Sequence, residues 1–418
     1  MSLVRTGIER VVHDPGLLGG GRIGLVTNPT GVLPDLTPGV TALLSAGVPV
    51  TALFSPEHGV RGAAQDGHGE AAGTDPATGL PVLDTYGAEG EALDELVEAA
   101  KVDTLVFDIA DIGTRFYTYV WTMYDLMASA ARLGVRFAVL DRPNPLGGTV
   151  AEGPLLDPAF ASFVGRAAIP LRHGLTAGEL ARHVNRSIGA DLLVVAAEGW
   201  RRDMPHAATG LPWVMPSANM PTPDTALVYP GTGLFEGTNL SEGRGTTRPF
   251  ELVGAPYLDE RFAAGLNALD LPGVRFRDAW FTPAFRKHAG VAVRGAQLHV
   301  HDAGAFRPVL TGVAMLHLAR SLHPEEFAWR RGDAGPGEET GRNEGTGHGE
   351  ETGRNGRAGQ DEGNAGPAGE DARPYFTDLL WGSDSLRRVL DAGDDPRGLC
   401  PPPCHPEVWT GGDPLLYR

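Results

Sequence analysis

The first half of the chain alternates short apolar runs with segments of helical periodicity, and this rhythm restricts the fold more than any other feature. The apolar runs lack the polar–apolar alternation of half-exposed strands, so we expect strands that are buried on both faces. Strands that alternate with helices predict an α/β fold, here a Rossmann-like domain around a parallel sheet. The predicted strands are Arg22–Thr27, Val50–Phe54, Thr104–Ile109, Val135–Leu140 and Leu192–Ala196. The predicted helices are Thr37–Ala46, Ala88–Ala100, Val120–Leu133 and Thr176–Ile188.

The 418 residues are enough for two domains. We place the Rossmann-like domain at residues 1–203 and a smaller α+β domain at residues 204–418. Residues 332–372 differ from the rest, because they lack large apolar and aromatic side chains and carry ten acidic residues against three arginines. Such a segment cannot bury enough apolar surface to fold, so we expect a disordered, acidic, Gly-rich insertion.

Polar residues follow four of the predicted strands at their carboxyl ends. In parallel sheets ligands bind at that edge, so these residues predict a site there. In chain order they are Asn28, Glu57, His58, Asp108, Asp111, Arg115, Tyr117, Tyr119, Asp141 and Asn144.

The stretch 213–256 is rich in Pro and Gly, and we predict an irregular loop there, neither helical nor a buried strand. Turn-forming residues that hold carboxylates, amides and guanidiniums together are typical of the wall of a polar-ligand site. The polar residues of this stretch are Asn219, Asp224, Glu236, Asn239, Glu242, Arg244 and Arg248.

Composition excludes several classes of protein. The formal net charge of -17 argues against nucleic-acid partners and anionic membrane surfaces. No phosphate-binding loop, nucleophile elbow or HExxH motif is present, so we expect no cofactor and no metal. No apolar run is long enough for a signal peptide or a membrane span, which predicts a cytoplasmic protein without membrane insertion.

The basic residues and the cysteines limit which side chains can recognise anions, form disulfides or bind zinc. Lys101 and Lys287 are the only lysines among 35 basic residues, so anion recognition is expected to depend on arginine. Cys400 and Cys404 permit one disulfide, or a zinc site with His405, but three prolines between them favour a rigid loop.

Carboxylates are the remaining groups with catalytic potential. Glu57 lies between Pro56 and His58 at a predicted strand end, where the backbone is rigid and burial is expected. Glu236 and Glu242 come from the long loop. Two carboxylates that face each other across a cleft are the usual equipment for cleaving a glycosidic bond.

Long stretches of the chain resemble the NamZ-type exo-β-N-acetylmuramidase family, chiefly SPEHG at 55–59, FDIADIGTRFYTYVWTM at 107–123 and EGTNLSEGRGTTRPFE at 236–251. The resemblance covers residues 24–256 and continues more weakly to GAQLHVHD at 295–302. It implies a hydrolase that releases N-acetylmuramic acid from the non-reducing ends of peptidoglycan fragments. It also implies a cleft between the two domains as the active site, with a muropeptide or other N-acetylmuramic-acid-containing saccharide as substrate.

The resemblance identifies Glu57 as the catalytic glutamate and the loop with Glu236, Asn239, Glu242 and Arg244 as its partner wall. The lactyl carboxylate of N-acetylmuramic acid requires a cation, for which Arg115, Arg244 and Arg248 are the candidates. Tyr117, Tyr119 and Trp121 are expected to stack on the sugar. The other predicted substrate-binding residues are Asn28, His58, Asp108, Asn144 and Asn219.

Several alternatives stay open at this stage. The mechanism can be retaining, inverting or assisted by the 2-acetamido group of the substrate. A metal-dependent sugar hydrolase or deacetylase would use His58, Asp108 and Asp111 as ligands. A muropeptide-binding protein without turnover would use the same cleft. The oligomeric state is not indicated by the sequence.

Overall fold

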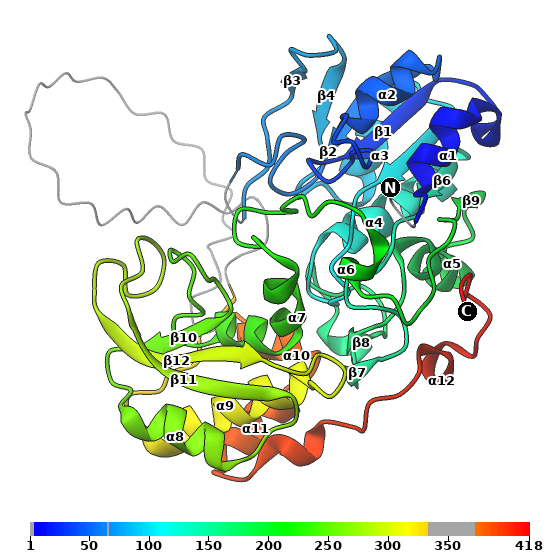
Figure 1. Ribbon diagram of the computed structural model, residues 1–418. Coiled ribbons are helices and arrows are strands. Elements are labelled where there is room, and N and C mark those ends of the chain that lie inside the picture. The colour runs from blue at the N-terminus through cyan, green and yellow to red at the C-terminus, as the bar shows by residue number, and fades with distance from the viewer. Residues whose placement is uncertain (1–3, 65–66, 333–372) are drawn as a thin grey trace, which may run out of the picture.

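A seven-stranded sheet forms the centre of the first half of the molecule (Figure 1). The computed structural model describes residues 4–64, 67–332 and 373–418. The strand order is β3-β4-β2-β1-β5-β6-β9, and all neighbours are parallel except β3 and β4. This confirms the predicted parallel sheet. The strands are β1 Ile23–Thr27, β2 Val50–Ser55, β3 Gly73–Thr74, β4 Pro81–Asp84, β5 Thr104–Asp108, β6 Arg136–Leu140 and β9 Leu192–Val195.

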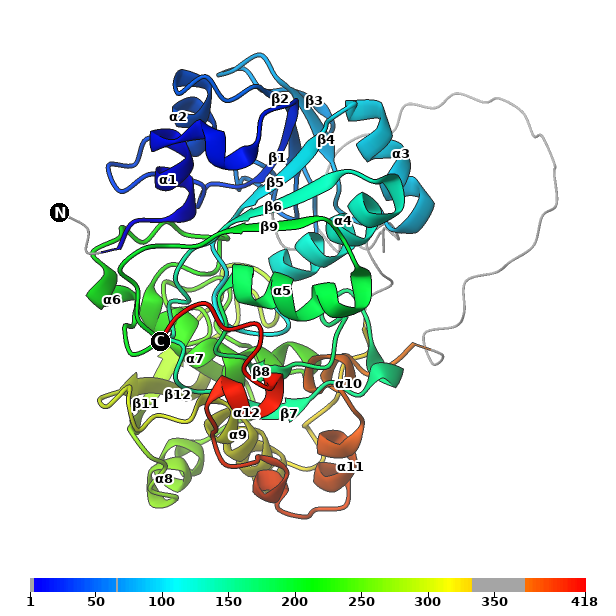
Figure 2. The ribbon, with the colours of Figure 1, turned by 90° about the vertical axis from the view of Figure 1, so that its right-hand side faces the viewer.

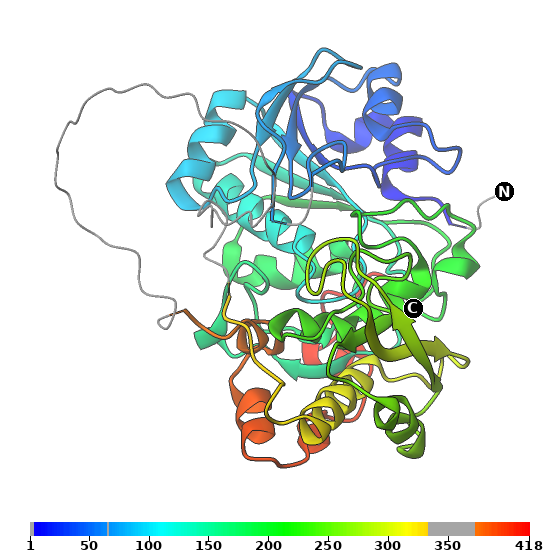
Figure 3. The ribbon, with the colours of Figure 1, turned by 90° about the vertical axis from the view of Figure 1, so that its left-hand side faces the viewer.

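Helices cover both faces of this sheet (Figure 2 and Figure 3). Side chains of β1 alternate between the two faces, so Leu25 packs in the core beneath α1 and α2 while Val26 packs in the core beneath α3, α4 and α5. The Thr176–Glu179 capping box predicted from the sequence starts α5. The helices are α1 Gly7–His13, α2 Gly39–Ser45, α3 Gly90–Ala100, α4 Tyr119–Leu133 and α5 Ala177–Ile188.

The second half is a smaller α+β unit, as predicted. Its antiparallel sheet has the order β10-β12-β11 and packs against α8, while α7 packs against α9. The elements are α7 Pro223–Thr232, β10 Leu252–Ala255, α8 Glu260–Ala268, β11 Val274–Phe281, β12 Val293–Val300, α9 Pro308–Leu322, α10 Phe376–Trp381 and α11 Ser385–Asp391. Shorter elements are β7 Glu152–Leu155, β8 Pro170–Arg172, α6 His206–Thr209, α12 Pro406–Thr410 and the 3-10 turns Pro15–Leu18, Pro158–Phe160, Gly233–Gly237 and Pro396–Leu399.

The C-terminal segment returns to the first half and packs beside α5 (Figure 2). Cys404 pairs with Ala151 in an antiparallel bridge. The hydroxyl of Tyr417 donates to Asp141 at 2.5 Å and accepts the backbone N–H of Ala197 at 2.8 Å. The boundary between 1–203 and 204–418 stays a proposal, and these contacts show that the last residues associate with the first unit.

The stretch 213–256 contains the helix α7 and the buried strand β10, contrary to the sequence-based expectation of an irregular loop that is neither helical nor a buried strand. Thr222 caps α7 by accepting the N–H of Thr225 at 3.2 Å. The helix packs so closely on α9 that a Cβ atom on Gly231 would lie 1.9 Å from the carbonyl oxygen of Pro308. The glycine that suggested a loop is therefore needed for a close contact between two helices.

The predicted insertion 332–372 lies, except for Gly332, outside the described residues, but the residues on either side of it are paired. Gly332 donates its N–H to the carbonyl of Pro374 at 2.8 Å, and Arg331 and Tyr375 form an antiparallel bridge. With Gly332 opposite Pro374, an inserted Asn-Gly pair and Arg373 would form a three-residue hairpin loop, a common connection between antiparallel strands. Replacing residues 333–372 with Asn-Gly should therefore raise the free energy of unfolding in urea by about 2 kcal/mol, because the shorter loop costs less entropy to close. A loss of stability would show that the segment packs on the fold.

Candidate active site

Glu57 is held rigidly just beyond the carboxyl end of β2. The residue is only 9% exposed, and its two carboxylate oxygens accept different hydrogen bonds. Oε2 accepts from the Thr118 hydroxyl at 2.6 Å, and Oε1 accepts from the Gly67 N–H at 2.8 Å. His58 follows in a left-handed conformation with φ 69°, and its Nδ1 lies 2.9 Å from the Ala64 carbonyl oxygen. The turn thus presents a buried carboxyl group in a fixed orientation.

Two tyrosines lie beside Glu57. The rings of Tyr117 and Tyr119 meet edge to face at 5.1 Å between centroids, and the Tyr119 hydroxyl donates to the Pro216 carbonyl at 2.5 Å. Burial raises the pKa of both phenols, and the charge of Glu57 raises each of them further. Both hydroxyls therefore stay protonated. The side chain of Asn28 adjoins the Tyr119 hydroxyl and helps to keep that pKa from rising more.

These contacts bring five predicted site residues to one edge of the sheet, namely Asn28, Glu57, His58, Tyr117 and Tyr119. The segment 211–222 passes over the same edge and supplies Pro216 and the buried Asn219.

A hollow beside Glu57 is lined by residues from four separate segments. We call it the Glu57 hollow; it is lined in part by Glu57, Thr118, Trp121, Asp125, Phe163 and Arg166. Thr118, Trp121 and Asp125 share one face at the start of α4 because they are three and four residues apart. Burial raises the pKa of Asp125 to about 6, although Arg166 opposes the shift. The hollow therefore combines a fixed carboxylate, an aromatic ring, an arginine and a carboxyl group that titrates near neutral pH.

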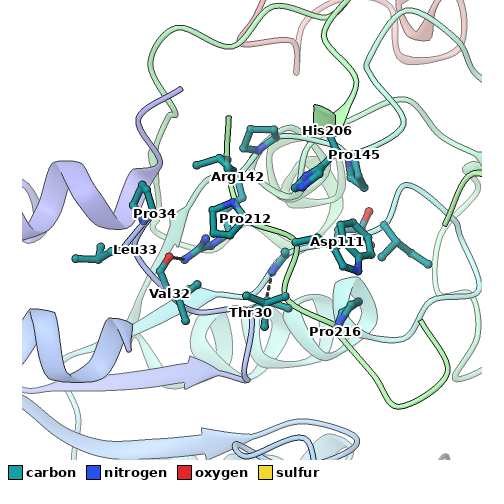
Figure 4. A pocket seen from close by; sticks show the side chains of 16 residues that line it. Thr30, Val32, Leu33, Pro34, Asp111, Arg142, Pro145, His206, Pro212 and Pro216 are labelled. Carbon is teal, nitrogen blue, oxygen red and sulfur yellow. Dashed lines mark hydrogen bonds between the residues drawn. The ribbon is translucent and has the colours of Figure 1, made fainter. Parts of the chain in front are cut away.

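A second hollow lies beyond the ends of β1, β5 and β6 (Figure 4). Thr30, Asp111, Arg142 and Trp213 are among its lining residues. Asp111 accepts the Gly113 N–H at 2.8 Å through Oδ2, while its Oδ1 is buried without a hydrogen-bond partner in the described part of the chain. Most of the other lining residues are prolines and aliphatic side chains, so this hollow offers few groups for acid–base chemistry.

The long loop of the second half contains a cluster of ionic groups. Lys287 donates to Glu242 at 2.8 Å, and Arg244 lies 3.4 Å from Glu242 while also pairing with Glu236. Burial by itself raises the pKa of Glu242, but the charges of Lys287 and Arg244 outweigh burial and the net pKa is lowered. Glu242 is thus held as an anion, which does not suit a proton donor.

A chain of aromatic contacts joins the two clusters. Tyr117 meets Tyr229 at 5.9 Å and Tyr229 meets Phe250 at 4.6 Å, both edge to face. The guanidinium of Arg244 lies 5.0 Å above the Phe250 ring. The Glu57 edge and the Glu242 cluster are therefore connected through packed rings.

The chain matches one protein family along most of its length. The model described as exo-β-N-acetylmuramidase NamZ, N-terminal, matches residues 23–224, and the corresponding C-terminal model matches residues 227–400. Peptidoglycan β-N-acetylmuramidase NamZ of Bacillus subtilis (strain 168) is 50% identical over 329 residues, which are 78% of this chain and 79% of that protein.

The chain belongs to the exo-β-N-acetylmuramidase NamZ family. Two crystal structures of DUF1343 family proteins from Bacteroides fragilis share the fold. One has a TM-score of 0.79 at 30% identity and covers 100% of both chains. The other has a TM-score of 0.65 at 25% identity and covers 99% of both chains. The resemblance noted in the sequence is therefore confirmed for this NamZ family member.

The structure assigns a different role to Arg115 from the predicted one. Its guanidinium is fully buried and donates to the carbonyl oxygens of Pro154, Ile169 and Leu380 at 3.0, 2.8 and 2.9 Å. Burial lowers its pKa to about 9. Arg115 thus ties distant segments together, and a substrate carboxylate does not reach it.

Four other predicted substrate-binding residues also have structural partners. Asp108 makes a two-point ion pair with Arg142 at 2.7 and 3.0 Å. Asn144 bonds to the backbone of Leu146 and Leu175, and Asn239 bonds to Tyr257, Glu326 and Ala328. Arg248 is largely exposed and pairs with Glu251. These side chains shape the scaffold around the site.

The three residues named as ligands for the metal-dependent alternative each have another partner. Asp108 is paired with Arg142, Asp111 faces His173, and His58 faces a backbone carbonyl. Within residues 4–64, 67–332 and 373–418 no group of three or more His, Cys, Asp or Glu side chains could hold a metal ion. Cys400 and Cys404 are free thiols. No helix in the same residues is long and apolar enough to cross a membrane.

Thr118, Asp125, Phe163 and Arg166 line the Glu57 hollow and were not predicted from the sequence. The helical spacing from Thr118 was a usable signal for Asp125. Phe163 and Arg166 belong to the segment around the turn Ser162–Gly165, far in sequence from the rest of the lining, and no local pattern marks them.

The two lysines of the chain form a natural pair for testing the ionic cluster. Lys287→Met leaves Glu242 buried without its closest cation, which should destabilise the protein by about 3–5 kcal/mol at pH 7. The pKa of Glu242 is below its usual value of 4.5, so the ion pair contributes stability above that pH and loses it as the pH falls. The difference between variant and parent should therefore shrink at acid pH, as measured by urea unfolding.

Lys101→Met is the control, because Lys101 is exposed at the end of α3. Its stability should match that of the parent. If both variants lost the same free energy of unfolding, the buried pair with Glu242 would not be a stabilising contact.

Proposed function

We propose that this protein is an exo-acting glycoside hydrolase that releases N-acetylmuramic acid from the non-reducing ends of peptidoglycan fragments. The observation that carries the proposal is the fixed, buried carboxyl group of Glu57 at the edge of the parallel sheet. A hollow with Trp121 and Phe163 adjoins it and suits a sugar ring. Membership of the NamZ family and the identity with a peptidoglycan β-N-acetylmuramidase support the substrate.

Glu57 is proposed to be the general acid that protonates the leaving glycosidic oxygen. A glycosidic oxygen leaves poorly until it is protonated, and a carboxyl group held in one orientation can deliver the proton without reorganising. Thr118 and Gly67 fix that orientation. Tyr117 and Tyr119 are buried beside it with neutral hydroxyls, and the Tyr119 ring meets the His58 ring edge to face, which supports the turn that carries Glu57.

Neither carboxylate of the long loop suits the role of nucleophile beside Glu57. Glu242 and Glu236 both contact Arg244, and Glu242 also contacts Lys287, so neither is a free nucleophile. We therefore favour attack by the 2-acetamido oxygen of the substrate on the anomeric carbon. The bond to the leaving oxygen breaks as that oxygen takes the proton of Glu57, and water then opens the cyclic intermediate while Glu57 recovers the proton. This route predicts retention of configuration at the anomeric carbon.

Glu57→Gln keeps the shape of the side chain but cannot deliver a proton. We expect kcat on an unactivated disaccharide to fall by ~10²–10⁴-fold with little change in substrate binding. The loss should be smaller on a chromogenic β-N-acetylmuraminide, because a phenol leaves without full protonation. Steady-state kinetics on both substrates measure the difference.

Glu70→Gln is a matched control in the same loop, since Glu70 pairs with Arg61 instead of lining the hollow. It should keep near-normal kcat. Near-normal kcat for Glu57→Gln on the disaccharide would remove Glu57 from the proton-donor role. Absence of turnover by the parent would favour a muropeptide-binding protein, and loss of activity on exhaustive chelation would favour the metal-dependent alternative.

A further inference from the structure

Selection of N-acetylmuramic acid over N-acetylglucosamine requires a cation near the sugar, because the two differ by the lactyl carboxylate. Of the three arginines predicted for this role, Arg115 is sealed inside the fold and Arg244 is held by two glutamates. Arg248 pairs with Glu251 on the surface and does not line the Glu57 hollow.

Arg166 does line the Glu57 hollow, and its guanidinium is only partly used. Its side chain is 18% exposed, and the same nitrogen, Nη2, contacts both Asp125, at 3.1 Å, and Glu89. In the described part of the chain, Nη1 and Nε have no hydrogen-bond partner. A guanidinium binds a carboxylate best through two parallel N–H groups, so Arg166 retains capacity for a second carboxylate.

The two carboxylates on Arg166 differ in how firmly they are held. Asp125 belongs to α4, and its side chain is 25% exposed. Glu89 precedes α3, and its side chain is 53% exposed at the rim of the hollow. An incoming carboxylate could replace Glu89 without changing the net charge around Arg166, while Asp125 keeps the guanidinium in position. Exposed ion pairs contribute little free energy, so the exchange costs little.

The spacing suits one sugar ring. Thr118, which bonds to Glu57, and Asp125, which bonds to Arg166, are seven residues apart on α4, or about 10 Å along the helix axis. Trp121 lies between them on the same face. A sugar stacked on Trp121 with its glycosidic bond at Glu57 would direct a substituent on another ring carbon toward Arg166.

We propose that Arg166 binds the lactyl carboxylate of the substrate in place of Glu89 and so selects muramic over glucosamine sugars. This assignment rests on the proposed function and adds a specificity-determining residue to it. Glu89 acts as an internal competitor for Arg166 when the hollow is empty of substrate.

The test compares two variants that should change affinity in opposite directions. Arg166→Leu should raise the KM for a chromogenic β-N-acetylmuraminide by about 10- to 100-fold, the range for one charge-assisted contact, with kcat changed less than threefold. Glu89→Gln removes the competitor and should lower that KM. Neither variant should alter the KM for the matching β-N-acetylglucosaminide. Arg132→Leu is the control, because Arg132 lies on α4 in an ion pair with Asp94 and outside the hollow.

Calorimetric binding of free N-acetylmuramic acid and N-acetylglucosamine separates this proposal from the proposed function. If the parent protein hydrolyses neither glycoside, the proposed function fails, and weaker binding of the muramic sugar alone by Arg166→Leu still supports the arginine. Equal losses on both sugars, or an unchanged muramic KM and affinity in Arg166→Leu, would overturn the assignment. If Arg166→Leu does not fold, an unchanged or higher muramic KM in Glu89→Gln would overturn it.

Discussion

The buried ion pair between Asp108 and Arg142 fixes the carboxyl edge of the sheet, on which the rest of the site depends. Asp108 ends β5, Arg142 follows β6, and the same guanidinium donates to the Val32 carbonyl just beyond β1 at 3.1 Å. Three strand ends are thus joined by one charged pair. Leaving either charge buried alone would cost several kcal/mol, so the ends are kept in one arrangement. The turn that carries Glu57 follows β2, the strand that pairs with β1.

Three carboxyl groups of this protein differ in hydrogen bonding and ionisation because the groups around them differ. Glu57 accepts neutral donors, a hydroxyl and an amide, and stays oriented at the edge of a hollow. Glu242 meets two cations and is held ionised. Asp125 is half-buried beside an arginine that only partly compensates for the loss of water, and the pKa of this residue rises to about 6. Position in the fold, and not residue type alone, therefore determines how each of these carboxyl groups is held.

Local patterns predicted most of the first half correctly, because buried parallel strands carry their signal within a few residues. The predicted strand Val50–Phe54 is β2 to within one residue, and the capping box predicted the start of α5. Local composition was misleading for α7, where contact with α9 decides the need for glycine. Arg115 was misassigned for a related reason. Its partners Pro154, Ile169 and Leu380 are 39, 54 and 265 residues away, and no motif records them.

The contact between Asp141 and Tyr417 has a consequence for how the chain folds during synthesis. The two residues are 276 positions apart, and Asp141 lies at the buried end of β6. At a ribosomal rate of about 5–20 residues per second, tens of seconds separate the emergence of the strand from that of its tyrosine partner. Throughout that interval the Asp141 carboxylate, just beyond the end of β6, has hydrogen bonds from Thr176 and Gly178 but lacks the one from Tyr417. The hydrogen bond from Tyr417 is therefore among the last contacts that the strand ends of the first unit can form during synthesis.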